Sequence, residues 1–340
     1  MKKMKHILSS AFLLPVLAAV LAVSCTKSAG EGANVAIKRQ FDAWRAIHYP
    51  DAVERNGVYI IEDKPGTGLE WNENLQVTFL TYTARTLDGT VSANSDEQWA
   101  KQLGQWDQTH YYGPQIVLTG EGISYAGLDA MLDGMRQGGT RTAIVPSWMM
   151  TRNRCESVDK YLETETEVSS AIYTVTFLDQ TENLTDYEYR QMQQYSYSHW
   201  MVSDTLSTAA VFFKSHSQTA LREMPTDTTV YINYIGRRIS DGQVFDTTIA
   251  DTAKFYHIYN PSRTYKPVSV TMAEKAEDVK LSNSTVVSGF AYGLKAMHPE
   301  EKASFVFGYN LGYGSSGGSD TAMVPPYAAL RFDVEMVPEP

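Results

Sequence analysis

The stretch that decides the fold lies near the carboxyl end. It runs ASFVFGYNLGYG (residues 303–314), crosses a Gly/Ser loop, and continues MVPPYAALRFDVEM (residues 323–336). Alternating apolar residues at both ends predict two β-strands, and the glycines and Pro325-Pro326 between them predict a structured connection. Tyr313, Val324, Tyr327 and Phe332 are expected to line one cavity. Segments upstream are then expected to complete that cavity.

Strand patterns recur upstream of this stretch, with turn signals between them. They lie at residues 58–61, 75–83, 142–145, 171–178, 211–213 and 230–235, and Asp88-Gly89 and Asp241-Gly242 mark turns. Apolar residues at helical spacing predict helices at 35–47 and 127–135. A linker helix is expected at 187–199, with a capping box from Thr185 to Glu188, and the polar segment 265–285 is expected to be a long loop or insertion. Strand and helix patterns are thus mixed along the chain.

The two halves of the chain repeat each other in order. Residues 82–89 match 234–242 with one residue inserted, 127–135 match 289–297, and 173–175 match 332–334. Blocks that match in the same order favour a duplicated domain.

The second half resembles the FKBP-type peptidyl-prolyl isomerases. The resemblance rests on five blocks between residues 229 and 337: Tyr234-Ile235-Gly236, Asp241 to Asp246, Val286 to Phe290, Leu311 to Gly314, and Val324-Pro325-Pro326 through Leu330 to Glu335. It implies an α+β fold with two FKBP-like domains, each a curved antiparallel sheet wrapped around a short helix. It also implies a pocket for a proline ring between sheet and helix, with no cofactor and no metal.

The resemblance assigns a role to each residue of the pocket. Phe245, Asp246 and Tyr313 are expected to be the catalytic residues, with Asp246 and the Tyr313 hydroxyl as polar contacts at the rim. Phe290 is expected to form the floor, where the family often has Trp, and the Val287 N–H is expected to hold a substrate carbonyl. The expected substrate-binding residues are Tyr234, Phe255, Val286, Val287, Phe290, Val324 and Phe332.

The first half departs from the family pattern where the pocket should be. Ser92-Ala93 stands at the place of Phe245-Asp246, and Thr151-Arg152 stands at the place of Tyr313-Gly314. Tyr82 and Leu128 remain as wall and floor equivalents. This half is therefore expected to be FKBP-like in fold and inactive, serving for packing or partner binding.

The amino terminus has the features of an export signal. Lysines at positions 2, 3 and 5 precede an apolar run from Ile7 to Val23, and Ala22-Val23-Ser24 before Cys25 resembles a bacterial lipobox. Lipidation of Cys25 would anchor the chain to a membrane. A short transmembrane anchor or an ordinary cleaved signal is the alternative. The expected location is the cell envelope, in the periplasm or at the outer membrane.

Composition excludes several function classes. The formal net charge of −10 and the absence of a basic cluster argue against nucleic-acid binding. Cys155 is the only cysteine besides Cys25, so no intrachain disulfide remains after lipidation. The seven histidines are scattered without metal-ligand spacing. The glycine pattern from Gly312 to Gly317 matches a dinucleotide fingerprint but is followed by a polar loop, not by a helix.

The expected organisation is a signal peptide at 1–24, a tether at 25–33, an N-terminal helix with a degenerate FKBP-like domain at 34–182, a linker helix at 183–204, and an FKBP-like domain at 205–340 with an insertion around 257–284. The leading hypothesis is a surface-anchored prolyl isomerase that assists the folding of exported proteins and acts on proline-containing polypeptides. The alternatives are a non-catalytic peptide-binding or chaperone lipoprotein and a purely structural envelope lipoprotein.

Overall fold

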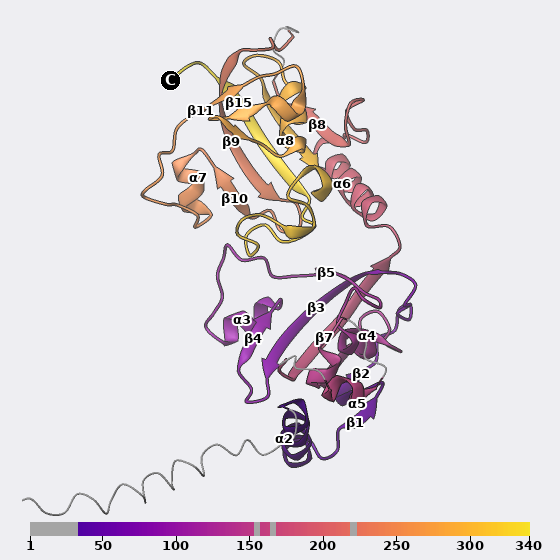
Figure 1. The fold of residues 1–340 in the computed structure, drawn as a ribbon. Coiled ribbons are helices and arrows are strands. Elements are labelled where there is room, and N and C mark those ends of the chain that lie inside the picture. The colour runs from indigo at the N-terminus through magenta and orange to yellow at the C-terminus, as the bar shows by residue number, and fades with distance from the viewer. Residues whose placement is uncertain (1–32, 153–156, 164–167, 218–222) are drawn as a thin grey trace, which may run out of the picture. The chain divides into compact units, whose positions relative to one another are not determined.

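The computed structural model describes residues 33–152, 157–163, 168–217 and 223–340. The expectations for the signal peptide, for Cys25 and for Cys155 lie outside the described residues. The chain divides into two compact units, residues 1–50 with 155–168, and residues 51–154 with 169–340. The first unit is small and helical, and the second contains both sheets (Figure 1).

The first unit consists of two described helices. α2 (Ala33–His48) confirms the helix expected at 35–47, and α5 (Val158–Leu162) was not expected. The Asn34 side chain donates a hydrogen bond of 3.2 Å to the Tyr161 carbonyl and so joins the two helices. Phe41 is buried on α2, whereas Ile47 is 74% exposed, so the apolar stripe is covered over only part of its length.

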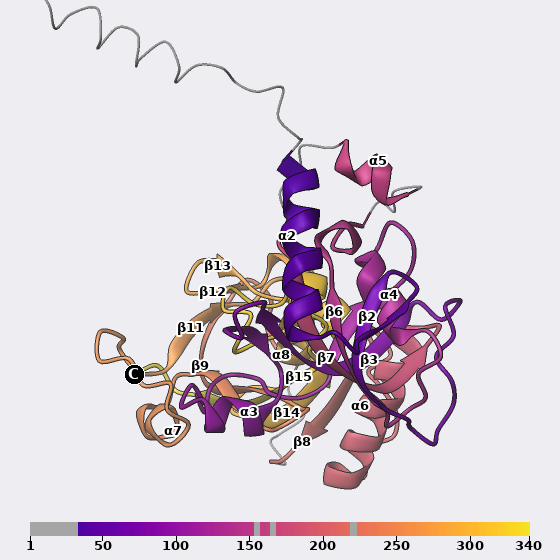
Figure 2. The ribbon, with the colours of Figure 1, turned by 90° about the horizontal axis from the view of Figure 1, so that it is seen from below.

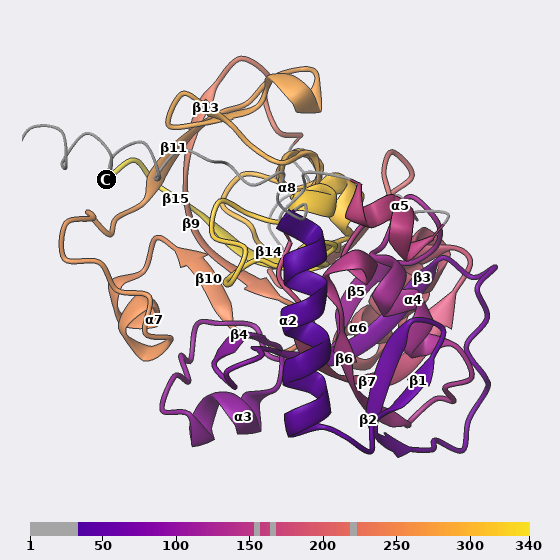
Figure 3. The ribbon, with the colours of Figure 1, turned by 60° about the horizontal axis from the view of Figure 1, so that its bottom comes forward.

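The first sheet of the second unit is antiparallel throughout. Its order is β1 (Val53–Arg55), β2 (Val58–Lys64), β6 (Thr140–Val145), β7 (Ala171–Thr181), β3 (Val77–Thr86), β4 (Val91–Asn94), with β5 (Gln115–Leu118) also on β3. α4 (Ala126–Leu132) packs on this sheet, and α3 (Glu97–Gln102) follows β4 (Figure 3). The strands expected at 58–61, 75–83, 142–145 and 171–178 are all present.

The second sheet is also antiparallel. Its order is β13 (Ser284–Thr285), β12 (Lys280–Leu281), β11 (Val268–Thr271), β9 (Thr229–Arg238), β15 (Leu330–Val337), β14 (Lys302–Phe307), β8 (Val211–Ser215), with β10 (Val244–Thr247) also on β9. α8 (Ser288–Lys295) covers it, and α7 (Ala250–Phe255) follows β10 (Figure 1). The 303–336 stretch supplies β14 and β15, which pair directly, with Phe305 opposite Phe332.

Strand order confirms the internal duplication. β2-β6-β7-β3-β5 in the first sheet corresponds to β8-β14-β15-β9-β11 in the second, and β4 corresponds to β10. The register agrees residue by residue, because Tyr82 lies opposite Val175 and Tyr234 lies opposite Val334. Both hairpins have a bulge at the same place, at Ser92 in β4 and at Phe245 in β10. Each half is therefore one copy of the same α+β domain.

Glycines let each helix approach its sheet closely. A Cβ built on Gly289 of α8 would lie 2.2 Å from the Phe307 ring, and one on Gly293 would lie 2.4 Å from the Phe305 ring. Since residues four apart share a helix face, both rings lie against one side of α8. In the first domain a Cβ on Gly127 of α4 would lie 2.2 Å from Val145. Figure 2 shows α8 beside β14 and β15.

Two local expectations are wrong. The segment expected as a loop at 265–285 contains β11, which pairs with β9 from Val268 to Thr271, because Val268 and Val270 alternate with polar residues and bury one face. The helix between the domains, α6 (Leu184–Trp200), is confirmed, but its N-cap is Asn183 and not Thr185. The Asn183 side chain accepts the Asp186 N–H at 3.1 Å. The η elements are η1 (Ser147–Met149), η2 (Ala276–Asp278), η3 (Tyr309–Leu311) and η4 (Gly314–Ser316).

Within the part of the chain that the structure describes, no helix is both long and apolar enough to span a membrane.

Candidate functional site

Five aromatic side chains gather where α8 meets the second sheet. They come from β9 (Tyr234), β10 (Phe245), α8 (Phe290), the loop before η4 (Tyr313) and β15 (Phe332). The ring centroids of Phe290 and Phe332 are 4.7 Å apart, those of Phe245 and Phe332 5.8 Å, and those of Phe245 and Tyr313 6.3 Å, the last two pairs edge to face. Tyr234, Phe290 and Phe332 are buried, Phe245 is half-buried and Tyr313 is exposed at the rim. The cluster thus grades from a buried floor to an open edge.

The backbone of β9 makes room for this cluster. Gly236 lies opposite Phe332 in the sheet, and a Cβ there would come within 2.8 Å of the Phe332 ring and 3.0 Å of the Phe245 ring. The bulge at Phe245 separates it from the regular register of β10. Glycine and bulge together bring the two rings edge to face above β9.

Asp246 lies beside the cluster in a polar network. The Tyr234 hydroxyl donates to one carboxylate oxygen at 2.5 Å, and an Arg263 guanidinium nitrogen contacts the other at 2.5 Å. A second Arg263 nitrogen lies 3.5 Å from the Tyr234 hydroxyl. Burial, followed by the charge of Asp246, raises the pKa of Tyr234 well above its ordinary value. The phenol therefore stays protonated and donates to the carboxylate.

Tyr313, in the loop before η4, lies beside Phe245, the residue that precedes Asp246. Burial and then the charge of Asp246 raise the pKa of its hydroxyl. The hydroxyl is a neutral donor at the rim, next to the half-buried Phe245 ring. A negative charge and a phenol hydroxyl thus border the open edge of the apolar cluster.

Three expected valines lie at the same place. Val324 is buried in the core of the second sheet, and Val286 and Val287 pack against that core from the start of α8. The Val287 carbonyl accepts the N–H groups of Phe290 and Ala291 at 3.0 and 3.2 Å. No residue of the described ranges accepts a hydrogen bond from the Val287 N–H. The expectation that this N–H holds a substrate carbonyl stays a prediction.

Phe255 does not join the cluster, contrary to the sequence expectation. Its side chain is 73% exposed, and the described ring that it contacts is Tyr256, at 5.0 Å. Ala253 is the buried residue of α7. Since residues two positions apart in a helix point about 200° away from each other, burial of Ala253 turns Phe255 toward solvent.

Arg263 is the residue that sequence reasoning missed. It lies outside the blocks of the family resemblance, in the segment expected as an insertion. A turn stabilised by the Asn260 side chain, which accepts the Ser262 N–H at 2.9 Å, brings Arg263 back toward Asp246. The Asn-Pro-Ser sequence predicts such a turn. It does not predict which carboxylate the next residue meets.

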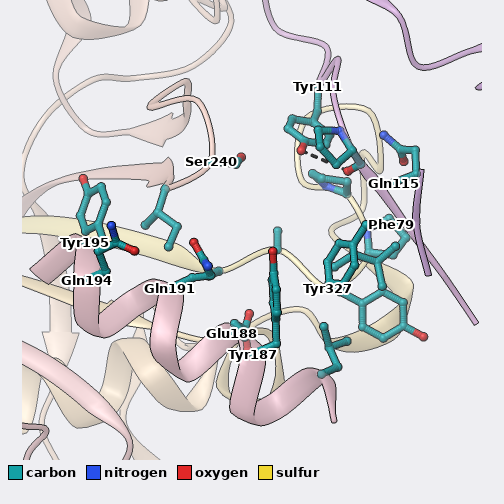
Figure 4. A pocket seen from close by; sticks show the side chains of 18 of the residues that line it. Phe79, Tyr111, Gln115, Tyr187, Glu188, Gln191, Gln194, Tyr195, Ser240 and Tyr327 are labelled. Atoms are coloured by element: carbon teal, nitrogen blue, oxygen red, sulfur yellow. Dashed lines mark hydrogen bonds between the residues drawn. The ribbon is translucent and has the colours of Figure 1, made fainter. Parts of the chain in front are cut away.

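Tyr327 was expected in the same cavity as Tyr313, and the structure places it elsewhere. Its ring packs on Tyr309 with centroids 5.2 Å apart, and it borders a different cavity of about 550 Å³. Figure 4 shows that cavity with Glu188, Gln191 and Tyr195 of α6 along one wall. Tyr327 has a φ of +61°, and its N–H donates to the Gly314 carbonyl at 3.0 Å. This cavity is lined by both polar and apolar side chains and shares none of them with the aromatic cluster.

In the described ranges, no group of three or more His, Cys, Asp or Glu side chains lies close enough together to bind a metal ion.

The first domain lacks the polar half of the site. In the first sheet Ala93 pairs with Ala84, as Asp246 pairs with Gly236 in the second sheet. Ser92 lies in the β-bulge that corresponds to the bulge at Phe245. Tyr173 stands for Phe332, and Tyr82 for Tyr234. The sequence alignment of the two halves is thus confirmed by strand pairing, and with it the absence of an aspartate at this position.

Comparisons with known proteins agree with this geometry. The family of FKBP-type peptidyl-prolyl cis-trans isomerases matches residues 222–337. FK506-binding protein 2 of Candida glabrata is 29% identical over 121 residues, which cover 36% of this chain and 71% of that protein. Macrophage infectivity potentiator of Trypanosoma cruzi is 25% identical over 132 residues, which cover 39% of this chain and 54% of that protein. The chain thus spans about half the length of the latter relative.

Solved structures that resemble the chain include FkpA from Escherichia coli and the three FKBP domains of wheat FKBP73. The first is 24% identical with a TM-score of 0.31 and covers 45% of this chain and 58% of its own. The second is 16% identical with a TM-score of 0.29 and covers 83% of this chain and 94% of its own.

Proposed function

We propose that the chain isomerises X-Pro bonds of exported polypeptides, with the activity in the second domain alone, whose residues 222–337 match the FKBP-type peptidyl-prolyl cis-trans isomerase family. The observation that carries the proposal is the placement of the Asp246 carboxylate and the Tyr313 hydroxyl at the open edge of the aromatic cluster. The equivalent positions in the first domain carry neither an acid nor an aromatic ring.

The chemistry needs no nucleophile. Rotation about a peptide bond faces a barrier of ~18–20 kcal/mol, because resonance keeps the bond planar. X-Pro bonds populate both isomers and exchange slowly. A catalyst must therefore bind the twisted bond more tightly than the planar one.

The site can supply this preference in two ways. A proline ring packs against the half-buried Phe245 and the buried Phe332, where exclusion of water disfavours the charge-separated planar amide. The Val287 N–H and the Tyr313 hydroxyl hold flanking carbonyls. Asp246, fixed by Tyr234 and Arg263, keeps a negative charge beside the rotating bond. These groups are preorganised, so little rearrangement is needed at the moment of rotation.

A second candidate function is the binding of unfolded chains without turnover. The observation that favours it is the reach of the segment after α7, whose Arg263 contacts Asp246 at the rim. A segment that occupies the rim could slow turnover while still permitting peptide contact. Suppressed aggregation of a client with unchanged proline kinetics would support this alternative.

The location in the cell envelope is part of the proposal. It is supported by the apolar run before Cys25 and by the small residues at 22–24. Incorporation of labelled palmitate into the wild-type chain but not into Cys25→Ala tests it. Equal incorporation, or none in either chain, would contradict lipidation at Cys25.

The decisive experiment measures cis–trans exchange in a tetrapeptide with a central Leu-Pro bond, using the full mature chain. The double variant Phe245→Ala with Asp246→Ala is expected to lose activity by about tenfold or more, which corresponds to ~1.4 kcal/mol of transition-state stabilisation. Ser92→Ala, at the bulge of the first domain that matches Phe245, is the matched control and should retain full activity.

Two outcomes would overturn the proposal. Wild-type chain that does not accelerate exchange would exclude isomerase activity. Full activity in the double variant would move the activity away from Asp246.

A further inference from the structure

The first domain contains an apolar cavity at the position that corresponds to the aromatic cluster of the second. The cavity has a volume of about 230 Å³ and lies between α4 and strands β3, β6 and β7. Tyr82, Leu128 and Tyr173 line it, and these residues stand for Tyr234, Phe290 and Phe332. It is a separate site from the one proposed for isomerisation.

Smaller side chains explain why the first domain is hollow there. Val145 stands at the position of Phe307. Val145 lies next to Gly127 of α4 in the same way that Phe307 lies next to Gly289 of α8. Leu128 replaces Phe290 in the helix. The loss of two rings leaves space that close packing would otherwise fill.

A third ring is also missing from the first domain, but a side chain from the helix fills its space. Ala143 pairs with Tyr173 as Phe305 pairs with Phe332, so Ala143 takes the place of Phe305. Met131 of α4 stands where Gly293 stands in α8, and its side chain is buried. A long side chain on the helix thus fills the space that the missing ring vacates. Beside Val145 and Leu128 the cavity remains, although Met149 also packs near Gly127.

The wall of the cavity is neutral, with phenol hydroxyls as its polar groups. Tyr82, Tyr125 and Tyr173 line it, together with aliphatic and methionine side chains, and no charged residue does. The three tyrosines line the same cavity, and burial, followed by the neighbouring hydroxyls of Tyr82 and Tyr125, raises the pKa of Tyr173. Within the described ranges no protein group hydrogen-bonds to these three hydroxyls. Tyr125 is 44% exposed, so the cavity reaches the surface beside it.

We propose that this cavity binds one large apolar side chain of an extended polypeptide, while the tyrosine hydroxyls donate hydrogen bonds to its main-chain carbonyls. A cavity of about 150 Å³ with apolar walls already accepts a benzene ring, so the volume here fits Phe, Leu or Met. A neutral wall excludes charged side chains. The site binds without isomerising, since no acid borders it, and it does not depend on activity of the second domain.

The test uses the full mature chain with ¹³C-methyl-labelled methionine, because Met131 and Met150 line the cavity. The probes are the peptides Ac-Ala-Xaa-Ala-Ala-NH₂, with Xaa as Phe, Leu, Pro, Lys or Gly. The Phe and Leu peptides are expected to shift the Met131 and Met150 signals in a saturable way, and the Lys and Gly peptides are not.

Three variants locate the binding. Val145→Phe installs the residue that the second domain carries at this position and should abolish the shifts. Tyr82→Phe with Tyr173→Phe keeps the volume and should weaken binding about tenfold, so it tests the hydroxyls even if Val145→Phe fails to fold. Phe245→Ala with Asp246→Ala should lose isomerisation and keep the methionine shifts.

Several results would overturn the inference: no shift with any peptide at millimolar concentration, shifts that persist in folded Val145→Phe, or equal shifts with the Gly peptide. Saturable shifts with octyl glucoside but not with peptides would assign the cavity to an acyl chain and would also overturn it.

Discussion

At the scale of single residues, Asp246 is held by groups that lie far from it in the sequence. Tyr234 donates from β9, and Arg263 contacts it from the segment after α7. The aspartate and the tyrosine follow from the family resemblance, because both lie in blocks that match. The arginine could not be assigned from sequence, since nothing in the local pattern shows which carboxylate it meets. Two of the three groups were thus predictable.

Removal of the arginine should weaken catalysis without abolishing it. Arg263→Met deletes a contact whose two side chains are 40% and 35% exposed, so solvent screening limits its worth to about 1 kcal/mol or less. The isomerisation rate constant kcat/KM should fall by up to about fivefold. Lys254→Met, which deletes the more exposed pair with Asp251, is the control and should leave kcat/KM unchanged. A rate increase in Arg263→Met would instead show that the segment obstructs the site.

At the scale of elements, the loop that carries Val324 is tied down by a buried arginine. Arg238 of β9 is 1% exposed and binds Asp241 through two nitrogens, at 3.0 and 2.7 Å. It also donates to the carbonyls of Ala322 and Met323 and, at 3.2 Å, to Thr109 of the first domain. Tyr111 also contacts this loop. Its backbone N–H donates to the Ala322 carbonyl at 2.8 Å, and its ring lies near the Arg238 guanidinium. The loop next to the site therefore depends on strands and on a segment of the other domain.

Arg238→Met should destabilise the second unit by about 3 kcal/mol, because several carbonyls and Asp241 lose their donor in a buried place. Urea denaturation followed by fluorescence measures the change. Arg237→Met is the matched control: its contact with Asp333 is 3.1 Å long and partly exposed, so its loss should cost about 1 kcal/mol or less. Equal stability of the two variants would contradict the anchoring role of Arg238.

At the scale of the whole molecule, Glu188 places an ionisable group at the packing surface of α6. Its side chain is 7% exposed, and it accepts the Tyr309 N–H at 2.9 Å. A Cβ on Gly308 would lie 2.2 Å from its carboxyl oxygen, so the fit is close. Burial raises the pKa of Glu188 to about 7, although the hydrogen bond from the Tyr309 N–H acts to lower it.

The sign of the resulting pH dependence follows from proton binding. Between the ordinary pKa of 4.5 and about 7, the folded chain keeps a proton that the unfolded chain releases. Stability therefore falls as pH rises through this window, and the full cost, up to about 3 kcal/mol, is present above pH 7. Glu188→Gln removes the cost and keeps an oxygen for the Tyr309 N–H.

The measurement compares the free energy of unfolding at pH 5 and pH 8. The advantage of Glu188→Gln over wild type should be larger at pH 8 than at pH 5. Glu182→Gln, an exposed glutamate just before α6, controls for loss of a carboxylate. A constant difference between Glu188→Gln and wild type across this pH range would refute a buried, proton-binding Glu188.

Local patterns along the chain are sufficient for much of this architecture. Alternation predicts most strands, and ordered repeats predict the duplication, because period and turn chemistry act between near neighbours. The family blocks add Phe245, Phe290 and Phe332, which the fold brings together. The sequence did not predict β11, because this strand is short and lies between polar residues. The predicted place of Phe255 was wrong, because the burial of Ala253 sets the orientation of α7.

The tertiary structure decides the features that local patterns do not predict. The Arg263 contact, the anchoring by Arg238, the protonation of Glu188 and the hollow left by Val145 and Leu128 all depend on which side chains face each other across elements. Such contacts join residues that are distant in the chain, and their energies depend on burial and on fit. The 303–336 stretch therefore predicts its two strands from its own composition, while the chemistry around Phe332 is completed by partners from β9, β10, α8 and the segment after α7.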